Sequence, residues 1–165
     1  MGRNDQDFRR RVDEWRPDLL SALAGLYGEQ ASAVADRLIA TARTRHSSRP
    51  KGLRALDRER ALRPDWFQQP DQVGYMAYVD RFGGDLGGVR NRIPHLRELG
   101  VTVLHLLSLF AARRGENDGG YAIRDYVRPD EANGTPEDLE ALVAELHAND
   151  ISLVADFVLN HTSDD

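Results

Sequence analysis

Three polar side chains follow the last apolar run of the chain, in the pattern Asp156-x-x-x-Asn160-His161. The run itself, residues 151–157, is nearly continuous in apolar residues, which is typical of a buried strand in a parallel sheet. A carboxylate, an amide and an imidazole at the end of such a strand could bind the hydroxyl groups of a ligand or form part of a metal site. The alternative is structural, with Asp156 in a buried polar network and Asn160-His161 at the start of a loop.

A second candidate motif is Asn117-Asp118-Gly119-Gly120-Tyr121, inside a stretch that we expect to be a long irregular loop, residues 108–133. Loops of that length are usually functional or disordered. The two glycines permit unusual backbone angles, so that Asp118 and Tyr121 could face one pocket. A carboxylate can bind sugar hydroxyls and an aromatic ring can stack on a sugar. The alternative is a plain Asp-Gly turn without a ligand.

Other candidate motifs predict neither a phosphate site nor a metal site. The glycines of residues 83–88 lack the spacing of a dinucleotide or phosphate loop, so we expect a strand-to-helix turn there. Asp156 and Asn160 supply two oxygen ligands, which is too few to hold calcium. His105 lies within a predicted strand and is expected to be a hydrogen-bonded core residue. We therefore expect no metal and no cofactor.

The elements that would position these residues alternate between strand and helix. Apolar runs predict strands at residues 73–79, 101–107 and 151–157, and a helix is predicted at residues 89–99. A second helix should begin after Thr135, its N-cap, with Pro136 at the first position. This β-α-β-α-β order predicts a parallel sheet covered on both faces, with right-handed crossovers. The strand ends would then bring Asp80, the loop with Asp118 and Tyr121, and Asn160-His161 to one edge.

Residues 6–68 have the three-to-four-residue apolar spacing of helices. Pro17 is expected to begin a second helical segment, and further segments are predicted around residues 31–42 and 53–62. We therefore divide the chain into a helical domain with its linker, residues 1–70, and an α/β domain, residues 71–165. Three parallel strands cannot close a barrel, and the last one lacks a covering helix, so we expect the chain to be a fragment.

Charge and composition narrow the partners. Residues 1–70 hold 14 Lys/Arg against 10 Asp/Glu, with signs that alternate, and residues 71–165 hold 8 against 17. This distribution favours neutral ligands such as sugars over nucleic acid. No apolar run approaches the ~20 residues of a membrane span, and the absence of cysteine favours the reducing cytoplasm. The oligomeric state stays open.

Four segments resemble amylosucrases, members of the α-amylase superfamily of glycoside hydrolases and transglycosylases. The segments are residues 78–86, 93–106, 115–121 and Asp156-Phe-Val-Leu-Asn-His161. The last resembles a signature shared widely in the superfamily, whereas Glu-Asn-Asp-Gly-Gly-Tyr121 is more specific to amylosucrase-like members. The resemblance implies a (β/α)₈ TIM barrel, of which this chain would hold an N-terminal helical domain and the first three β/α units.

The resemblance also implies roles for the site residues. Tyr121 would stack on the glucosyl ring of sucrose, His161 would bond its hydroxymethyl group, and Asp118 would pair with a later arginine. Asp156 would be structural, and Asp80 is grouped with it as a supporting residue. The position of Asn160 binds calcium in many α-amylases, whereas amylosucrases are expected to lack that ion.

The activity that the resemblance implies is transfer of glucose from sucrose onto α-glucan by double displacement. Its two carboxyl groups arise from later strands, so we expect no catalytic residue in this chain and no activity from it alone. Ser108 stands where the family usually has proline, and residues 126–133 also depart from the family pattern. Two alternatives stay open. One is another superfamily reaction, such as sucrose hydrolysis, trehalose synthesis or α-glucosidase action, and the other is a non-catalytic carbohydrate-binding protein.

Overall fold

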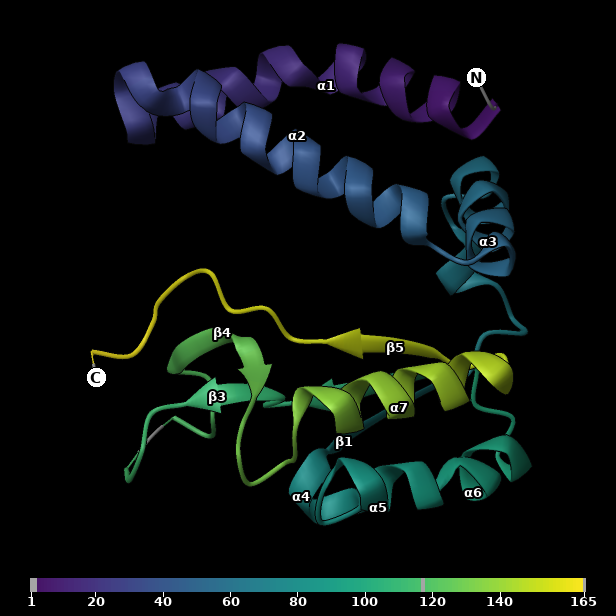
Figure 1. Ribbon diagram of the computed structural model, residues 1–165. Helices are drawn as coiled ribbons and strands as arrows, with labels where there is room; N and C mark the ends of the chain where they lie inside the picture. Colours follow the sequence, from purple (N-terminus) through teal and green to yellow (C-terminus); the bar gives the residue numbers. More distant parts are fainter. Residues whose placement is uncertain (1–2, 117, 165) are drawn as a thin grey trace. The chain divides into compact units, whose positions relative to one another are not determined.

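The computed structural model of the protein describes residues 3–116 and 118–164. Asn117, the first residue of the second motif, and Asp165, the last residue of the expected α/β domain, lie outside the described residues. The contacts divide the chain into two compact units, residues 1–64 and 65–165, which are described separately (Figure 1). In the described part of the chain, no helix has both the length and the apolar character required to cross a membrane.

Unit 1 is helical. It consists of α1 (Arg3–Tyr27), a 3-10 turn (Gly28–Gln30), α2 (Ala31–Ser48) and α3 (Lys51–Leu62). The 3-10 turn reverses the chain so that α1 and α2 pack against each other. Their contact buries Leu23, Ala31 and Ala35, with Leu19, Leu20 and Val34 packed around them. The small alanine side chains let the two helices approach closely.

The expected break at Pro17 is wrong, because α1 runs through this residue without interruption. A proline inside a helix removes one backbone hydrogen bond and is normally unfavourable. The turn that follows Pro17 carries Leu19, Leu20 and Leu23, which pack against α2. Burial of these side chains favours continuation of the helix.

Unit 2 contains the predicted parallel sheet. After a 3-10 turn (Trp66–Gln68), its three parallel strands are β1 (Gly74–Tyr78), β2 (Val103–Leu107) and β5 (Ser152–Ala155), in the order β1-β2-β5. Ala77 lies beside Leu106, and Leu106 beside Ala155. The three strands were predicted from apolar runs, and their existence and parallel direction are confirmed.

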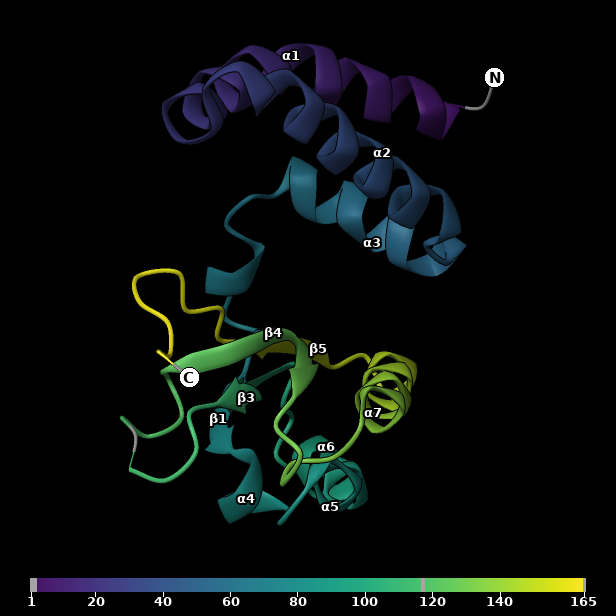
Figure 2. The ribbon, with the colours of Figure 1, turned by 60° about the vertical axis from the view of Figure 1, so that its left-hand side comes forward.

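Helices of unit 2 cover one face of this sheet. They are α5 (Leu86–Asn91), α6 (Ile93–Glu98) and α7 (Pro136–Ala148), and they share one core with the fully buried Leu104 and Leu106 of β2. Figure 2 shows the three helices on the same side of the strands. The opposite face carries His105, Met76 and Val154, of which Met76 is 65% and Val154 41% exposed. Within this unit, the prediction of two covered faces is therefore wrong.

The turn after β1 and the helix predicted at residues 89–99 differ from expectation. A short helix, α4 (Val79–Phe82), follows β1 directly, and the later helix is divided into α5 and α6. Asp85 caps α5 by accepting a hydrogen bond from the Gly88 amide at 2.6 Å. Pro94 explains the division, because it lacks an N–H and its ring would clash with a carbonyl one turn earlier. In the turn itself, a Cβ on Gly88 would lie 1.8 Å from the Gly83 carbonyl oxygen, so the backbone there requires glycine.

The stretch expected to be an irregular loop, residues 108–133, contains two antiparallel strands, β3 (Phe110–Ala112) and β4 (Ile123–Pro129). Ala111, Ala112 and Ile123 of these strands are buried, which favours their pairing. The expectation of a structureless loop is wrong, and only residues 113–122 connect the two strands.

The predicted start of α7 is confirmed. Thr135 Oγ1 accepts a hydrogen bond from the Asp138 amide at 3.1 Å, and the Asp138 carboxylate accepts one from the Thr135 amide at 2.9 Å. This reciprocal arrangement is a capping box, and Pro136 occupies the first helical position.

Candidate functional site

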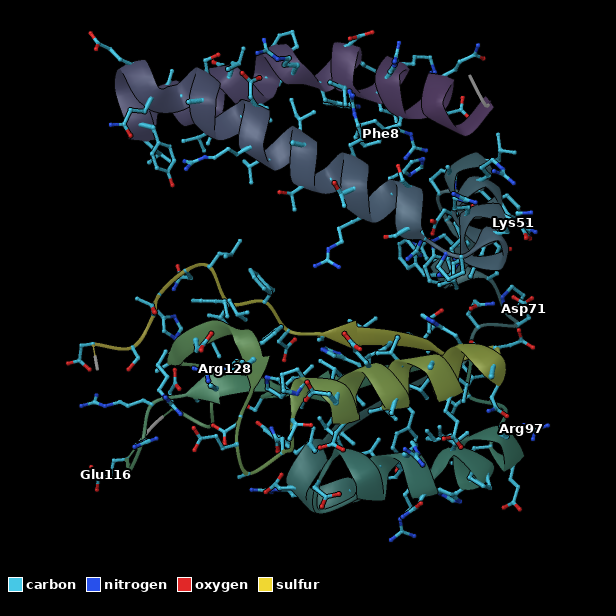
Figure 3. All side chains as sticks on the ribbon, viewed as in Figure 1. Phe8, Lys51, Asp71, Arg97, Glu116 and Arg128 are labelled. Carbon is cyan, nitrogen blue, oxygen red and sulfur yellow. The ribbon has the colours of Figure 1, made fainter. Side chains whose placement is uncertain are left out.

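The candidate site lies at the end of unit 2 where the parallel strands finish. Figure 3 shows Glu116 and Arg128 at this end, and Asp71 and Arg97 at the opposite end. Asp118 and Tyr121 lie in the connection between β3 and β4, Asp156 follows β5 directly, and His161 lies five residues further on. Two separate segments therefore supply these side chains, the β3–β4 connection and the chain after β5.

Asp156 joins the β3–β4 connection to β2 through its two carboxylate oxygens. Oδ2 accepts a hydrogen bond from the Tyr121 hydroxyl at 2.9 Å, and Oδ1 lies 2.7 Å from Nε2 of His105 on β2. The Asp156 side chain is 25% exposed and that of His105 30%. Burial, followed by the hydrogen bond to Asp156, raises the pKa of the Tyr121 phenol well above its usual range. The phenol therefore remains a hydrogen-bond donor at neutral pH, and the bond holds the tyrosine ring in one orientation.

Asp118 makes a second set of bonds. Its Oδ1 accepts hydrogen bonds from the amides of Tyr121 at 2.9 Å and Ala122 at 2.7 Å, and its Oδ2 lies 3.0 Å from Nε2 of His161. Partial desolvation opposes ionisation, but the bonds from Ala122, His161 and Tyr121 hold the pKa of Asp118 below its usual range. Asp118 is therefore a carboxylate that fixes both the turn and the imidazole.

These contacts define the tautomer of His161. A carboxylate only accepts hydrogen bonds, so Nε2 of His161 carries the proton that it shares with Asp118. Nδ1 lies 3.3 Å from the Asn160 amide nitrogen, which has only hydrogen atoms to donate. Nδ1 of the neutral ring is thus an acceptor, and Asn160 contacts the site through its neighbour His161.

The structure brings together Asp118, Tyr121, Asp156 and His161, as the order of the strands predicts. Asp80 occupies a different position, exposed on α4. It lines a pocket of about 370 Å³ with Ser108, Gly119 and Gly120, so it faces the glycines of the motif. In residues 3–116 and 118–164, no hydrogen bond joins the Asp80 side chain to the Asp118–Tyr121–Asp156–His161 network. Asp80 therefore lies near Gly119 and Gly120 of the motif, as expected, but does not join its side-chain network.

His105 is a site residue whose role was missed from the sequence. It was expected to be hydrogen-bonded in the core; it is hydrogen-bonded, but to Asp156 on the face that the helices of unit 2 leave uncovered. His105 lies beside Val154 in the register, and Asp156 follows Val154 by two residues. Because side chains alternate along strands, His105 and Asp156 share one face. The register of the two strands, once known, would have revealed this pair.

Ser108 and Gly120 form a close contact beneath the motif. Ser108 has φ +52°, and its hydroxyl donates to the Gly119 carbonyl oxygen at 2.5 Å. Gly120 has φ +89°, and a Cβ there would lie 2.5 Å from Ser108 Oγ. Proline is fixed near φ −65° and could not adopt the conformation of Ser108. Ser108, which stands where the family resemblance implies proline, therefore has a backbone conformation that proline could not adopt.

Among the described residues, no group of three or more histidine, cysteine, aspartate or glutamate side chains has the geometry of a metal site. The two carboxylates of the network are both engaged by hydrogen-bond donors. The arrangement can instead offer an oriented aromatic ring, an imidazole and carboxylate lone pairs to a polar ligand.

Comparison with known proteins identifies relatives of this segment. Residues 58–165 match the protein family described as alpha amylase, catalytic domain. Amylopullulanase from Thermoanaerobacterium saccharolyticum is 37% identical over 111 residues, which is 61% of this chain and 8% of that protein. Oligo-1,6-glucosidase from Heyndrickxia coagulans is 39% identical over 82 residues, 50% of this chain and 14% of that protein.

A solved structure is similar to this chain over part of its length. It is a MutB mutant crystallised in complex with the substrate sucrose, with 30% identity and a TM-score of 0.53 over 61% of this chain and 18% of that one. The chain thus spans less than a fifth of the length of each of these three relatives. The three parallel strands and their helices correspond to an N-terminal part of the TIM-barrel-type fold of these enzymes.

Proposed function

The chain belongs to the alpha-amylase catalytic-domain family, and on this premise we propose that the network of unit 2 is one wall of a sugar-binding site. We propose further that residues 1–70 are a helical domain with its linker, and that residues 71–165 are the first three β/α units of a (β/α)₈ barrel. In such barrels the ligand lies at the carboxyl ends of the strands. Asp118, Tyr121, Asp156 and His161 meet at that end.

The observation that carries the proposal is the fixation of Tyr121 at two points. Its amide donates to Asp118 and its hydroxyl to Asp156, at opposite ends of the residue. The ring is only partly buried, and a rigid aromatic face of this kind suits stacking against the apolar face of a sugar. Little conformational entropy is lost on binding, because the ring is already ordered.

His161 and Asp118 would supply the polar contacts, since their side chains are 45% and 43% exposed. Asp118 keeps unused carboxylate lone pairs, and Nδ1 of His161 would accept from the ligand in place of its 3.3 Å contact with Asn160. We assign His161 to the hydroxymethyl group of a glucosyl unit, and Asp118 to closure of the pocket with an arginine from a later segment. Asp156, Asn160 and Asp80 would have supporting roles, and the bonds of Asp156 to Tyr121 and His105 support its structural assignment.

For the whole enzyme we propose the amylosucrase reaction, in which glucose passes from sucrose to an α-glucan by double displacement. A retaining reaction requires two carboxyl groups about 5 Å apart, one as nucleophile and one as acid/base. We assign those groups to later strands of the barrel, so this chain alone should bind sugar without releasing fructose from sucrose. The likeness to a sucrose-bound relative supports the choice of donor. We place the enzyme in the cytoplasm, with carbohydrate and neither nucleic acid nor membrane as its partner.

The second candidate is α-glucosidase action on short α-glucosides. It is favoured by the 39% identity to an oligo-1,6-glucosidase. Both candidates use a glucosyl-binding pocket, so they share the proposed roles of Tyr121 and His161.

Saturation-transfer NMR with sucrose, maltose and glucose tests the binding proposal. We expect transfer of magnetisation to the sugar ring protons, and its loss in Tyr121→Ala. Tyr27→Ala is the matched control, since Tyr27 belongs to unit 1 and is 49% exposed. Absence of transfer with all three sugars, or an equal effect of both variants, would overturn the proposal. Release of fructose above the uncatalysed background would show that this chain needs no later carboxylates.

A further inference from the structure

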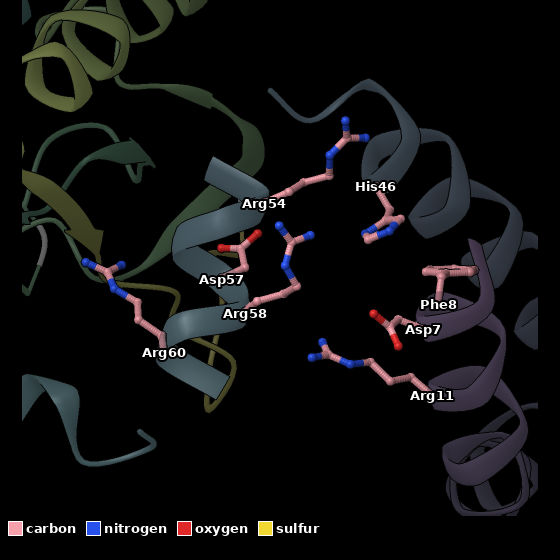
Figure 4. Close-up of a pocket in the computed structure, with 8 residues that line it drawn as sticks. All are labelled: Asp7, Phe8, Arg11, His46, Arg54, Asp57, Arg58 and Arg60. Carbon is pink, nitrogen blue, oxygen red and sulfur yellow. The ribbon is translucent and has the colours of Figure 1, made fainter. Parts of the chain in front are cut away.

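A cavity in the helical unit has no part in the proposed sugar site. It has a volume of about 310 Å³ and is lined by residues of α1, α2 and α3, all within unit 1 (Figure 4). The lining residues are Asp7, Phe8, Arg11, His46, Arg54, Asp57, Arg58 and Arg60. A cavity of this size is large enough for a small organic ligand.

The lining is rich in positive charge. It holds four arginines and one histidine against two aspartates, a formal surplus of two positive charges with the histidine neutral. One of the aspartates, Asp57, is already paired with Arg49, whose Nε and Nη2 lie 2.5 and 2.9 Å from its carboxylate oxygens. Arg49 does not line the cavity, so Asp57 divides its charge between Arg49 and the lining residues Arg11 and Arg60.

Two nitrogen atoms of the lining are buried without a partner. Within the described part of the chain, neither Nε2 of His46 nor Nε of Arg54 has a hydrogen-bond partner. Arg54 makes one long bond through Nη1, 3.4 Å from the Ser47 carbonyl oxygen. Buried polar atoms in folded proteins almost always have partners, so two such atoms in one cavity point to a ligand that forms hydrogen bonds. Nε of Arg54 must donate, and Nε2 of His46 donates in the tautomer that carries its proton there.

Contacts between α1 and α2 hold one wall of the cavity in place. The Phe8 ring on α1 stacks on the His46 ring on α2, with centroids 5.2 Å apart and an interplanar angle of 29°. The Arg43 guanidinium lies 5.8 Å from the centroid of the Phe8 ring. Figure 4 shows Arg54 and Arg58 directed from α3 toward the space between the helices, with His46, Phe8 and Arg11 on its other side. The donors therefore come from three helices and surround one volume.

We propose that this cavity binds a small phosphate-bearing anion. A phosphate group carries up to two negative charges and three strong acceptor oxygens, and arginine forks match its geometry. Nε2 of His46 and Nε of Arg54 would each donate to it, which gives both buried atoms a partner. A pocket between three helices with one aromatic wall suits a small molecule, whereas a nucleic-acid surface would need an extended basic stripe.

Isothermal titration of the full chain with inorganic phosphate and with glucose 6-phosphate tests the proposal, with glucose as the neutral control. Arg54→Gln should weaken phosphate binding roughly tenfold or more, since a charge-assisted bond is lost. Arg37→Gln removes the same charge from an exposed position of α2 outside the cavity and should change affinity less than about twofold. Equal affinity for the two anions would identify a site for phosphate alone, and tighter binding of the sugar phosphate would add a contact to the organic part.

Two further variants keep the test decisive. Arg54→Lys retains the charge but lacks Nε, so it should give an intermediate loss even if Arg54→Gln disturbs the helices, which circular dichroism would show. Tyr121→Ala should leave phosphate binding unchanged, which separates this cavity from the sugar site. The proposal is overturned by absence of binding to both anions at about 10 mM, by equal effects of Arg54→Gln and Arg37→Gln, or by loss of binding in Tyr121→Ala.

Discussion

Replacement of Gly120 by alanine would place a methyl group 2.5 Å from Ser108 Oγ and 2.8 Å from Ser108 Cβ. Two costs follow. The positive φ of +89° disfavours any residue with a Cβ by about 1–2 kcal/mol. Displacement of Ser108 would add about 1–3 kcal/mol for overpacking, including loss of its bond to the Gly119 carbonyl. We expect Gly120→Ala to lower the free energy of unfolding by about 2–5 kcal/mol, a large part of the roughly 5–15 kcal/mol that is typical of folded proteins.

Two controls separate these costs. Gly100 has φ +72° with open space around a built Cβ, so Gly100→Ala should show the backbone cost alone, about 1–2 kcal/mol. In the double variant Gly120→Ala/Ser108→Gly, the obstructing hydroxymethyl group is gone and a glycine replaces serine at φ +52°. Its free energy of unfolding should recover to about that of Gly100→Ala.

The assay is urea denaturation followed by tryptophan fluorescence. The chain has two tryptophans, of which Trp15 lies in unit 1 and Trp66 in unit 2. Trp15 is 61% exposed, so Trp15→Phe is a mild background that leaves Trp66 as the reporter of unit 2. The steric argument fails if Gly120→Ala costs no more than Gly100→Ala, or if Ser108→Gly restores nothing.

Three other perturbations test the contacts of unit 2. Tyr121 should not ionise near pH 10, because its pKa is raised in the folded state. The stability that this raised pKa contributes is complete below pH 10 and is lost as the pH rises through the folded pKa. Absorbance at 295 nm should therefore rise near pH 10 equally in Tyr121→Phe and in the wild type. An absorbance increase near pH 10 that is smaller in Tyr121→Phe by the contribution of one tyrosinate would contradict this prediction. The pKa of Asp118 is lowered in the folded state, which contributes stability above about pH 4 that is lost as the pH falls through the folded pKa. Asp118→Asn should therefore make the free energy of unfolding depend less steeply on pH in the acid range. An unchanged pH dependence would contradict the Asp118 contacts. Thr135→Ala should cost about 1 kcal/mol in urea denaturation through loss of the α7 cap, and a change near zero would mean that water replaces the cap.

The sequence was sufficient to predict the parallel sheet because its strands are apolar runs separated by helical periodicity. Thr135 and Pro136 marked the start of α7, since both residue types have a specific place at a helix N-terminus. The meeting of Asp118, Tyr121 and His161 also followed from topology alone, because parallel strands end at one edge. These features depend on local pattern or on chain direction.

Features that depend on tertiary packing were not predicted. Pro17 lies inside α1 because packing against α2 outweighs its local preference. The β3–β4 pair was missed because β3 has only three residues and the register of the pair is irregular, so no alternation marks it. The pairing of His105 with Asp156 required the strand register, which periodicity does not supply. The division of α5 from α6, by contrast, could have been predicted from Pro94.

The segment that follows β5 is tied to β4 at both of its ends. The Tyr126 hydroxyl donates to the Val158 carbonyl oxygen at 2.6 Å, and Thr162 Oγ1 and the Ser163 amide both donate to the Ile123 carbonyl oxygen, at 2.6 and 2.9 Å. His161 lies between these anchors. Local opening of residues 156–164 should therefore release the His161 imidazole and the Asp118 turn together, as one cooperative unit in hydrogen exchange. The amides of Tyr121 and Ser163, far apart in the sequence, should then exchange with similar protection and become slower together when a sugar binds.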